Sequence, residues 1–299
     1  MPPPHDPRLD LARRTATDVV GRLGITGVAL DVVRVGTSIL FASTTDGMLV
    51  RVEDRGDTAS ARRQVTVGRY LAECGVPAVV PLDDIDQPVV TDTGAVTLWR
   101  LEQLVPGEVD PATLGALARH LHGATTDAGA GAGLPTLDPL GAVRRQLATA
   151  GVSTLDDVVA DLATRWSGFA TVMPTALVHG DLHPGNVLLT RRGPVLADLE
   201  LAGVGPVAYD LVPAVVAVQR YGEPARSLAE YARAYGQPIA PAARHGVLRD
   251  TYEMWLTAWA LANRHLDARH DLEARRRLAR WTPVPLRPGP LGAPHWSLL

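Results

Sequence analysis

The chain contains no lysine, so its 29 Lys/Arg positions are all arginine. Its single cysteine, Cys74, excludes an internal disulfide and a cysteine-based metal cluster. No apolar run approaches the ~18 residues of a membrane-spanning helix. The opening "MPPPHDPRLD" has no signal-peptide core. With a formal net charge of -3 there is also no overall basic field to recruit nucleic acid or a membrane surface. We therefore expect a cytoplasmic globular protein that binds neither.

The spacing of apolar residues predicts an α+β fold in two lobes, for which 299 residues suffice. The first hundred residues indicate a small antiparallel sheet with helices, and nearly everything after the segment "VPGEVDP" has helical spacing. We expect an N-terminal lobe over 1–103 with a hinge at 98–103, and a helical C-terminal lobe over 104–299. The proline-rich tail from residue 282 is expected to lie extended on the surface. Helices are predicted at 8–23 and 59–74, and strands at 29–35, 39–43, 48–53, 78–82 and 95–101.

The stretch "LVHGDLHPGNVLL" places two histidines, an aspartate and an asparagine within eight residues. Its proline and glycine impose a tight loop, which allows Asp181 and Asn186 to face one pocket. Asp198 follows at the end of an aliphatic run. Carboxylate and amide oxygens suit Mg²⁺, which takes few protein ligands together with phosphates. An aspartate that is not a ligand can accept a hydrogen bond from an incoming hydroxyl. This set suits phosphoryl transfer, where the protein aligns reactants and neutralises charge.

The motif pair "HGDLHPGN" and "LADLELAGVGPVAYDL" resembles that of the aminoglycoside phosphotransferase and choline kinase family, relatives of the protein kinases. The resemblance extends over nearly the whole chain. "RVGTSILF" resembles the nucleotide loop, "VTLWRL" the hinge, and "YDLVPAVV" the helix after the metal site. It implies a protein-kinase-like fold and a kinase that acts on a small molecule.

On this resemblance, Asp181 is the catalytic aspartate that orients the acceptor hydroxyl. His183 is assigned to the same catalytic loop, with mere loop packing as the alternative. Asn186 and Asp198 would hold Mg²⁺, with Glu200 in the outer shell of the metal site. Two further residues, His179 and Asp210, would brace the catalytic loop, although Asp210 could also simply cap the following helix.

The nucleotide side departs from the family pattern. Kinases of this type hold the phosphates with a strand lysine paired to a helix glutamate, and here those positions fall on Arg51 and Gln64. Arginine can grip phosphate through two N–H groups, and a glutamine oxygen could accept from it without the charge–charge attraction. Glu53 lies on the same strand face and could pair with Arg51 locally. Arg51 and Gln64 could each instead be an ordinary surface residue. The remaining nucleotide contacts are expected from Gly36, Thr37 and Ser38 in the loop, and from the hinge backbone of Trp99 and Leu101, where Trp99 could equally be a core residue.

The acceptor pocket is expected in the helical lobe. Between residues 225 and 280 we count ten arginines and six acids, an excess that argues mildly against a polycationic aminoglycoside. Asp250, Glu253 and Trp255 have spacings that could line a cleft, although a helix packing an aromatic stripe into the core explains them as well.

We therefore expect a monomeric or homodimeric phosphotransferase that moves the γ-phosphoryl group of ATP or GTP, with Mg²⁺, to a hydroxyl of a small molecule. The leading hypothesis is an antibiotic of aminoglycoside, peptide or nucleoside type, modified in resistance or self-protection. A metabolic kinase for an amino alcohol or a sugar is the first alternative. A nucleotide-binding pseudokinase is the second.

Overall fold

The computed structural model describes residues 7–53, 58–126, 133–170, 173–239, 245–282 and 296–297. The chain forms two compact units. Unit 1 comprises residues 1–108 together with 186–200, and unit 2 comprises 109–185 together with 201–299. The catalytic-loop motif is therefore divided, since the residues up to Gly185 belong to unit 2 and those from Asn186 to Glu200 belong to unit 1.

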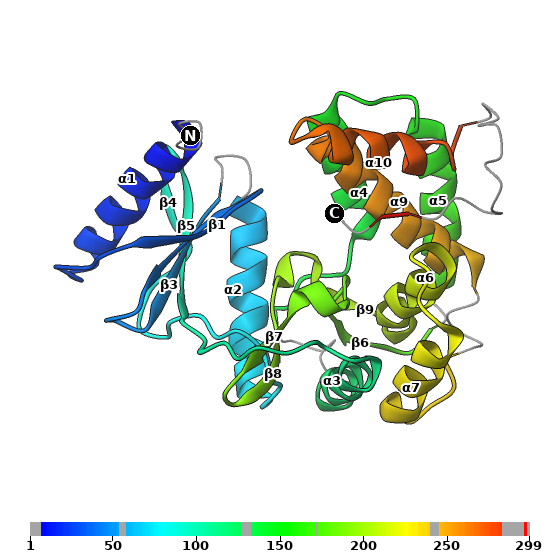
Figure 1. Cartoon of the computed structure of the whole chain (residues 1–299), viewed down its shortest axis with the longest axis horizontal. Coiled ribbons are helices and arrows are strands. Elements are labelled where there is room, and N and C mark those ends of the chain that lie inside the picture. The colour runs from blue at the N-terminus through cyan, green and yellow to red at the C-terminus, as the bar shows by residue number, and fades with distance from the viewer. Residues whose placement is uncertain are drawn as a thin grey trace. The chain divides into compact units, whose positions relative to one another are not determined.

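Unit 1 is built on a five-stranded antiparallel sheet with the strand order β1-β2-β3-β5-β4. Helices α1 and α2 pack on its two faces, as Figure 1 shows. Alternate residues of each strand point to opposite faces, so Val50 and Val52 of β3 enter the core under α1 while Arg51 and Glu53 face the other side. The elements are α1 (Pro7–Arg22), β1 (Asp31–Val35), β2 (Ile39–Ser43), β3 (Met48–Glu53), α2 (Thr58–Glu73), β4 (Val89–Thr91) and β5 (Gly94–Arg100).

A short hairpin completes unit 1. Its strands β7 (Val187–Thr190) and β8 (Gly193–Leu196) pair antiparallel, from Val187 opposite Leu196 to Thr190 opposite Gly193. Two loop segments hold the hairpin: Val79 N donates to Leu196 O at 2.8 Å, and Val105 N donates to Leu189 O at 2.9 Å. These backbone bonds fix the strand that leads directly into Asp198.

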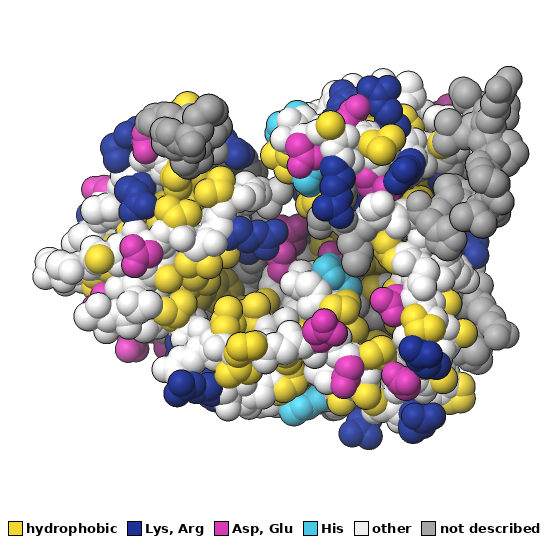
Figure 2. Space-filling model, viewed as in Figure 1, with side chains coloured by type: hydrophobic (Ala, Val, Ile, Leu, Met, Phe, Trp, Pro, Cys, Tyr) yellow, Lys and Arg dark blue, Asp and Glu magenta, His cyan; other side chains and the backbone are white. Residues whose placement is uncertain are grey.

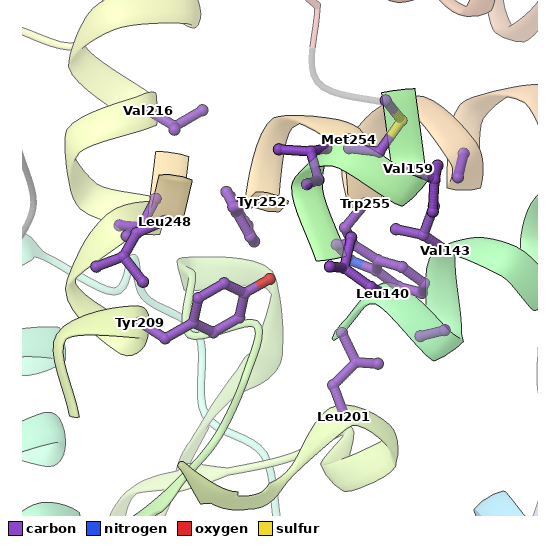
Figure 3. Close-up of a cluster of buried hydrophobic side chains, with 14 of the residues drawn as sticks. Leu140, Val143, Val159, Leu201, Tyr209, Val216, Leu248, Tyr252, Met254 and Trp255 are labelled. Carbon is purple, nitrogen blue, oxygen red and sulfur yellow. The ribbon is translucent and has the colours of Figure 1, made fainter. Parts of the chain in front are cut away.

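Unit 2 is mainly helical, with one two-stranded sheet of β6 (Thr175–Val178) and β9 (Gly203–Pro206). Its core gathers apolar side chains of α4, α5, α6 and α9 around Tyr209 and Tyr252 (Figure 3). None of the described helices, in either unit, is long and apolar enough to cross a membrane. The helices are α3 (Pro111–Ala124), α4 (Pro139–Ala150), α5 (Asp156–Ala170), α6 (Val212–Arg220), α7 (Ala225–Tyr235), α9 (Gly246–Asn263) and α10 (Ala268–Leu278).

Two sequence predictions for local structure are wrong. The segment 78–82 forms only isolated bridges at Ala78 and Pro81 instead of a strand, because Pro81 has no N–H to continue a ladder. The tail was expected on the surface, yet Trp296, one of its three described residues, is buried. Its ring lies against the guanidinium groups of Arg220 and Arg277, at 5.3 and 5.2 Å from the ring centroid.

Candidate active site

In unit 2, Asp181 lies in the loop that follows β6, beside a tyrosine hydroxyl and two histidines. The hydroxyl of Tyr252 on α9 donates to Asp181 Oδ1 at 2.6 Å, and the Asp181 N–H donates to His179 Nδ1 at 3.3 Å. The other carboxylate oxygen, Oδ2, lies 3.6 Å from His183 Nε2. Burial alone would raise the pKa of Asp181, but His183, the Tyr252 hydroxyl and His179 outweigh it and lower the pKa below its usual range. The carboxylate is therefore ionised at neutral pH.

The loop that carries Asp181 is fastened through Asp210. This fully buried carboxylate accepts the backbone N–H groups of His179 and Gly180, both at 2.7 Å, and contacts His122 Nε2 at 3.0 Å. His122 Nδ1 lies 3.0 Å from the Tyr235 hydroxyl, which extends the network to α7. The N-cap of α6 is the next residue, Leu211, and the helix has no side-chain cap, so the Asp210 carboxylate serves the loop and does not cap α6.

Gly180 is required at its position for two reasons. Its φ of 83° lies in the left-handed region, and a Cβ there would meet Leu201 at 2.9 Å. A larger residue would displace the loop next to Asp181. His183 is partly exposed, and its Nδ1 accepts the Gly185 N–H at 3.1 Å, so it contacts both the carboxylate and the turn of the loop.

In unit 1, Arg51 lies among three carboxylates. Its Nε donates to Glu53 Oε1 at 2.7 Å, while Nη1 and Nη2 lie 3.7 Å from Asp198 Oδ1 and Glu200 Oε2. Burial would lower the pKa of Arg51, but the negative charges of Asp198, Glu53 and Glu200 together raise it above the usual value. The guanidinium is thus oriented at Nε by its own strand, and its terminal nitrogens point toward the residues predicted to hold Mg²⁺.

Gln64 contacts Glu53 instead of Arg51. This buried side chain of α2 donates through Nε2 to Glu53 Oε1 at 2.8 Å, the same oxygen that binds Arg51. The side-chain amide of a glutamine can donate to a carboxylate, whereas an ionised glutamate cannot. Gln64, at the helix position where related kinases have a glutamate, is therefore suited to a neighbouring glutamate on the strand. Glu53 thereby supplies the charge that the helix position lacks.

The residues predicted to hold a metal all belong to unit 1. Asp198 has a φ of 60°, a strained conformation for a non-glycine residue, and its Oδ1 is buried without a hydrogen-bond partner in the described structure. The Asn186 carbonyl accepts the Ala197 N–H at 2.9 Å, which ties the start of the hairpin to its end. Over the described ranges no group of three or more His, Cys, Asp or Glu side chains is arranged for a metal. Two carboxylates and one amide would still be enough for Mg²⁺, which keeps several waters and takes only one or two carboxylates.

The other predicted nucleotide residues are spread over unit 1. Gly36, Thr37 and Ser38 form the turn between β1 and β2, closed by the Gly36 N–H to Ser38 O at 3.1 Å. Trp99 is buried against Gly68 of α2, where a Cβ would come within 3.1 Å of its ring. The Leu101 N–H already donates to Gly47 O at 2.8 Å.

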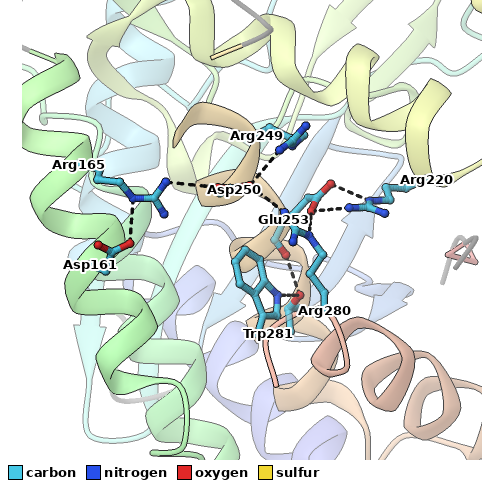
Figure 4. A network of polar contacts seen from close by, with 9 residues as sticks. Asp161, Arg165, Arg220, Arg249, Asp250, Glu253, Arg280 and Trp281 are labelled. Atoms are coloured by element: carbon cyan, nitrogen blue, oxygen red, sulfur yellow. Dashed lines mark hydrogen bonds and ion pairs between the residues drawn. The ribbon is translucent and has the colours of Figure 1, made fainter. Parts of the chain in front are cut away.

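The acids predicted for the acceptor are bound by arginines (Figure 4). Glu253 is fully buried, and its two oxygens accept Arg220 Nε at 2.8 Å, Arg220 Nη2 at 3.0 Å and Arg280 Nε at 2.6 Å. Asp250 accepts Arg280 Nη2 at 2.9 Å, with Arg165 and Arg249 nearby at 3.4 Å. The face in Figure 2 shows arginine and acidic side chains mixed in this way over α9 and α10.

Trp255 lies in the hydrophobic core of unit 2 beside Leu140 and Val159, with 3% of its surface exposed (Figure 3). Sequence reasoning offered Glu53 as a local partner of Arg51, which the structure confirms, but it missed His122 and Tyr252. Both lie far along the chain from the residues they contact, and local spacing gives no signal for either.

The fold is of the protein-kinase-like class. A choline/ethanolamine kinase family protein from Mesorhizobium loti superposes with a TM-score of 0.58 at 22% identity, covering 91% of this chain and 96% of the other. LicA in complex with AMP gives 0.60 at 13% identity, with 90% and 98% covered. The GDP complex of a mutant of aminoglycoside 2'-phosphotransferase IIIa gives 0.59 at 14% identity, also with 90% and 98% covered.

The model of the phosphotransferase enzyme family matches residues 34–247. The chain belongs to this family, and it is a phosphotransferase with a hydroxyl acceptor. A comparison with curated proteins gives no match.

Proposed function

We propose that this protein transfers the γ-phosphoryl group of ATP or GTP to a hydroxyl group of a small molecule. The observation that carries the proposal is the ionised Asp181 carboxylate, held in a braced loop by a tyrosine hydroxyl at 2.6 Å. The nucleotide complexes named above, with AMP and with GDP, support a purine nucleotide as the co-substrate.

In the proposed reaction the acceptor hydroxyl donates its hydrogen bond to Asp181, which turns the oxygen lone pair toward the γ-phosphorus. A bond forms between this oxygen and phosphorus while the bond from phosphorus to the bridging oxygen breaks, and the nucleoside diphosphate leaves. The hydroxyl proton passes to the Asp181 carboxylate and then to solvent. Because the lowered pKa makes Asp181 a weak base, its role is orientation more than early proton removal.

The nucleotide would be held by unit 1. Arg51 offers its terminal N–H groups to the phosphates, as arginine does in paired contacts with phosphate oxygens. Asn186 and Asp198 would hold Mg²⁺, with Glu200 beside them, and the buried Oδ1 of Asp198 fits such a ligand. When bound, the ion neutralises phosphate charge. The turn at Gly36–Ser38 and the backbone at Trp99 and Leu101 are proposed to contact the rest of the nucleotide.

The acceptor is proposed to be a neutral or weakly charged compound. A polycationic aminoglycoside needs unpaired carboxylates, but Asp250 and Glu253 are already bound to arginines. Moving the arginines away from Asp250 or Glu253 would leave a buried carboxylate without a partner, which costs free energy. The first candidate is therefore an antibiotic of peptide or nucleoside type, modified for resistance or self-protection in the cytoplasm. A metabolic alcohol is the second candidate, since choline kinase relatives share the fold.

Mass spectrometry tests this proposal directly. The protein is incubated with ATP or GTP and Mg²⁺ against aminoglycoside, peptide and nucleoside antibiotics and common amino alcohols. The proposal predicts that one neutral or weakly charged compound gains the mass of one phosphoryl group, and that the gain disappears in Asp181→Asn. Bound nucleotide without phosphoryl transfer to any acceptor or to water would support the pseudokinase alternative instead.

A further inference from the structure

Tyr252 makes a short, buried contact with the proposed catalytic carboxylate. Its hydroxyl donates to Asp181 Oδ1 at 2.6 Å, and 3% of the residue's surface is exposed. The tyrosine comes from α9, 71 residues along the chain from Asp181. A hydrogen bond to an ionised acceptor is about twice as strong as one between neutral groups. The contact can therefore fix the rotamer of the carboxylate.

The tyrosine is itself held rigidly. Its ring packs edge-to-face on Tyr209, with centroids 6.2 Å apart and an interplanar angle of 83° (Figure 3). The next residue, Glu253, is locked by Arg220 and Arg280, so the helix backbone at this point cannot rotate freely (Figure 4). Little conformational freedom remains to be lost when Tyr252 binds Asp181, since its position is set by the core.

The contact also divides the two oxygens of Asp181 between two surroundings. Oδ1 faces the buried tyrosine, whereas Oδ2 faces His183, whose side chain is 40% exposed. A small molecule arriving from solvent would approach on the histidine side. Fixing Oδ1 therefore aims Oδ2 toward the direction of approach.

We propose that Tyr252 is a positioning residue, which holds the Asp181 carboxylate so that Oδ2 accepts the hydrogen bond of the acceptor hydroxyl. This inference rests on the proposed function and deepens it. A competing possibility is that the tyrosine hydroxyl stands where the acceptor hydroxyl binds and must be displaced. The two possibilities predict opposite effects when the hydroxyl is removed, because a displaced group hinders binding and a positioning group helps turnover.

The test compares Tyr252→Phe with Tyr209→Phe. The control is matched, because Tyr209 is equally buried in the same ring pair and its hydroxyl has no hydrogen-bond partner in the described structure. Hydrolysis of Mg-ATP and Mg-GTP is the probe, since water then serves as the acceptor and no other acceptor need be known. Any acceptor found by mass spectrometry is measured as well, and thermal unfolding verifies that both variants are folded.

We expect Tyr252→Phe to lower kcat about tenfold or more, the loss of one hydrogen bond to a charged group, with an unchanged nucleotide KM. Tyr209→Phe should match the wild-type protein. Equal kcat values in wild type and Tyr252→Phe, or a lower acceptor KM with unchanged kcat, would overturn the positioning role while leaving the proposed function intact. Absence of phosphoryl transfer to water or any acceptor in the wild type would overturn the proposed function, and this inference with it.

Discussion

The two units hold their key carboxylates in opposite ways. In unit 1, Glu53, Asp198 and Glu200 surround one guanidinium, so their negative charges are offset by the positive charge of Arg51. In unit 2 no arginine is described against the two carboxylates: Asp210 accepts two backbone N–H groups beside His122, and Asp181 accepts a tyrosine hydroxyl beside His183. Backbone N–H and hydroxyl donors favour the ionised carboxylate without the permanent positive charge of an arginine. The two units therefore suit different tasks. The arginine and carboxylates of unit 1 suit the proposed binding of phosphate and metal, whereas unit 2 keeps a carboxylate anion available for the proposed acceptor hydroxyl.

The largest effect is expected from breaking the unit 2 arrangement at its centre. Asp181→Asn keeps the shape but removes the anion, so we expect turnover to fall by about 10² to 10⁴. The readout is the rate of product formation at saturating substrates. Asp156→Asn, at an exposed position in the first turn of α5, is the control and should behave as wild type. An unchanged rate in Asp181→Asn would remove this residue from the mechanism.

In unit 1 the corresponding change is Arg51→Ala. Loss of the guanidinium leaves three carboxylates that repel one another and the phosphates, so we expect the nucleotide KM to rise, or kcat to fall, about tenfold or more. Steady-state kinetics with ATP and GTP measure the change. Arg62→Ala, exposed on α2, provides a matched loss of one arginine. If Arg51→Ala leaves both constants unchanged, Arg51 does not contact the nucleotide.

The bracing of the loop can be tested by stability as well as by activity. Asp210→Asn replaces a buried anion that accepts two backbone N–H groups and contacts His122. We expect the free energy of unfolding to fall by about 2–3 kcal/mol, measured by urea denaturation. Asp110→Asn, at the exposed N-cap of α3, is the comparison and should cost less than about 1 kcal/mol, because asparagine caps helices as well as aspartate does. Similar losses in the two variants would contradict the bracing role.

The smallest effect concerns pH. The pKa of Asp181 lies below its ordinary value of 3.8, so the carboxylate stays charged as the pH falls to that value. We therefore expect the pH profile of kcat/KM to show no acid limb from Asp181 above about pH 5. Removing the Tyr252 hydroxyl removes a bond that favours the charged form, which raises the pKa and moves the limb to higher pH. A limb that stays in place in Tyr252→Phe would show that the hydrogen bond does not affect the carboxylate.

Much of the architecture could be predicted from local pattern. The two N-terminal helices and strands β2, β3 and β5 lie within one or two residues of the predicted ranges, because apolar spacing and turn residues mark them. Strand β4 at Val89–Thr91 was missed, since three residues carry too little periodicity to be recognised. The segment 78–82 looked like a strand by composition but contributes only bridges.

The candidate site was predicted only where it is contiguous in sequence. The loop residues from His179 to Asn186 and the aspartates at 198 and 210 came from motifs, whereas Tyr252 and His122 reach the loop only through tertiary packing. The sequence alone leaves the partner of Arg51 open, because Glu53 and Gln64 are both in reach. The structure shows that both contact the same oxygen, an outcome that depends on side-chain geometry and not on spacing.

The division between the two units is tested most directly by the affinity for nucleotide. Calorimetric titration of Mg-ADP and Mg-GDP into wild type, Asp181→Asn and Arg51→Ala gives three dissociation constants for each nucleotide. We predict that Asp181→Asn binds as tightly as wild type although it has lost turnover, while Arg51→Ala binds about tenfold more weakly or worse. Weakened binding in Asp181→Asn together with unchanged binding in Arg51→Ala would contradict the account.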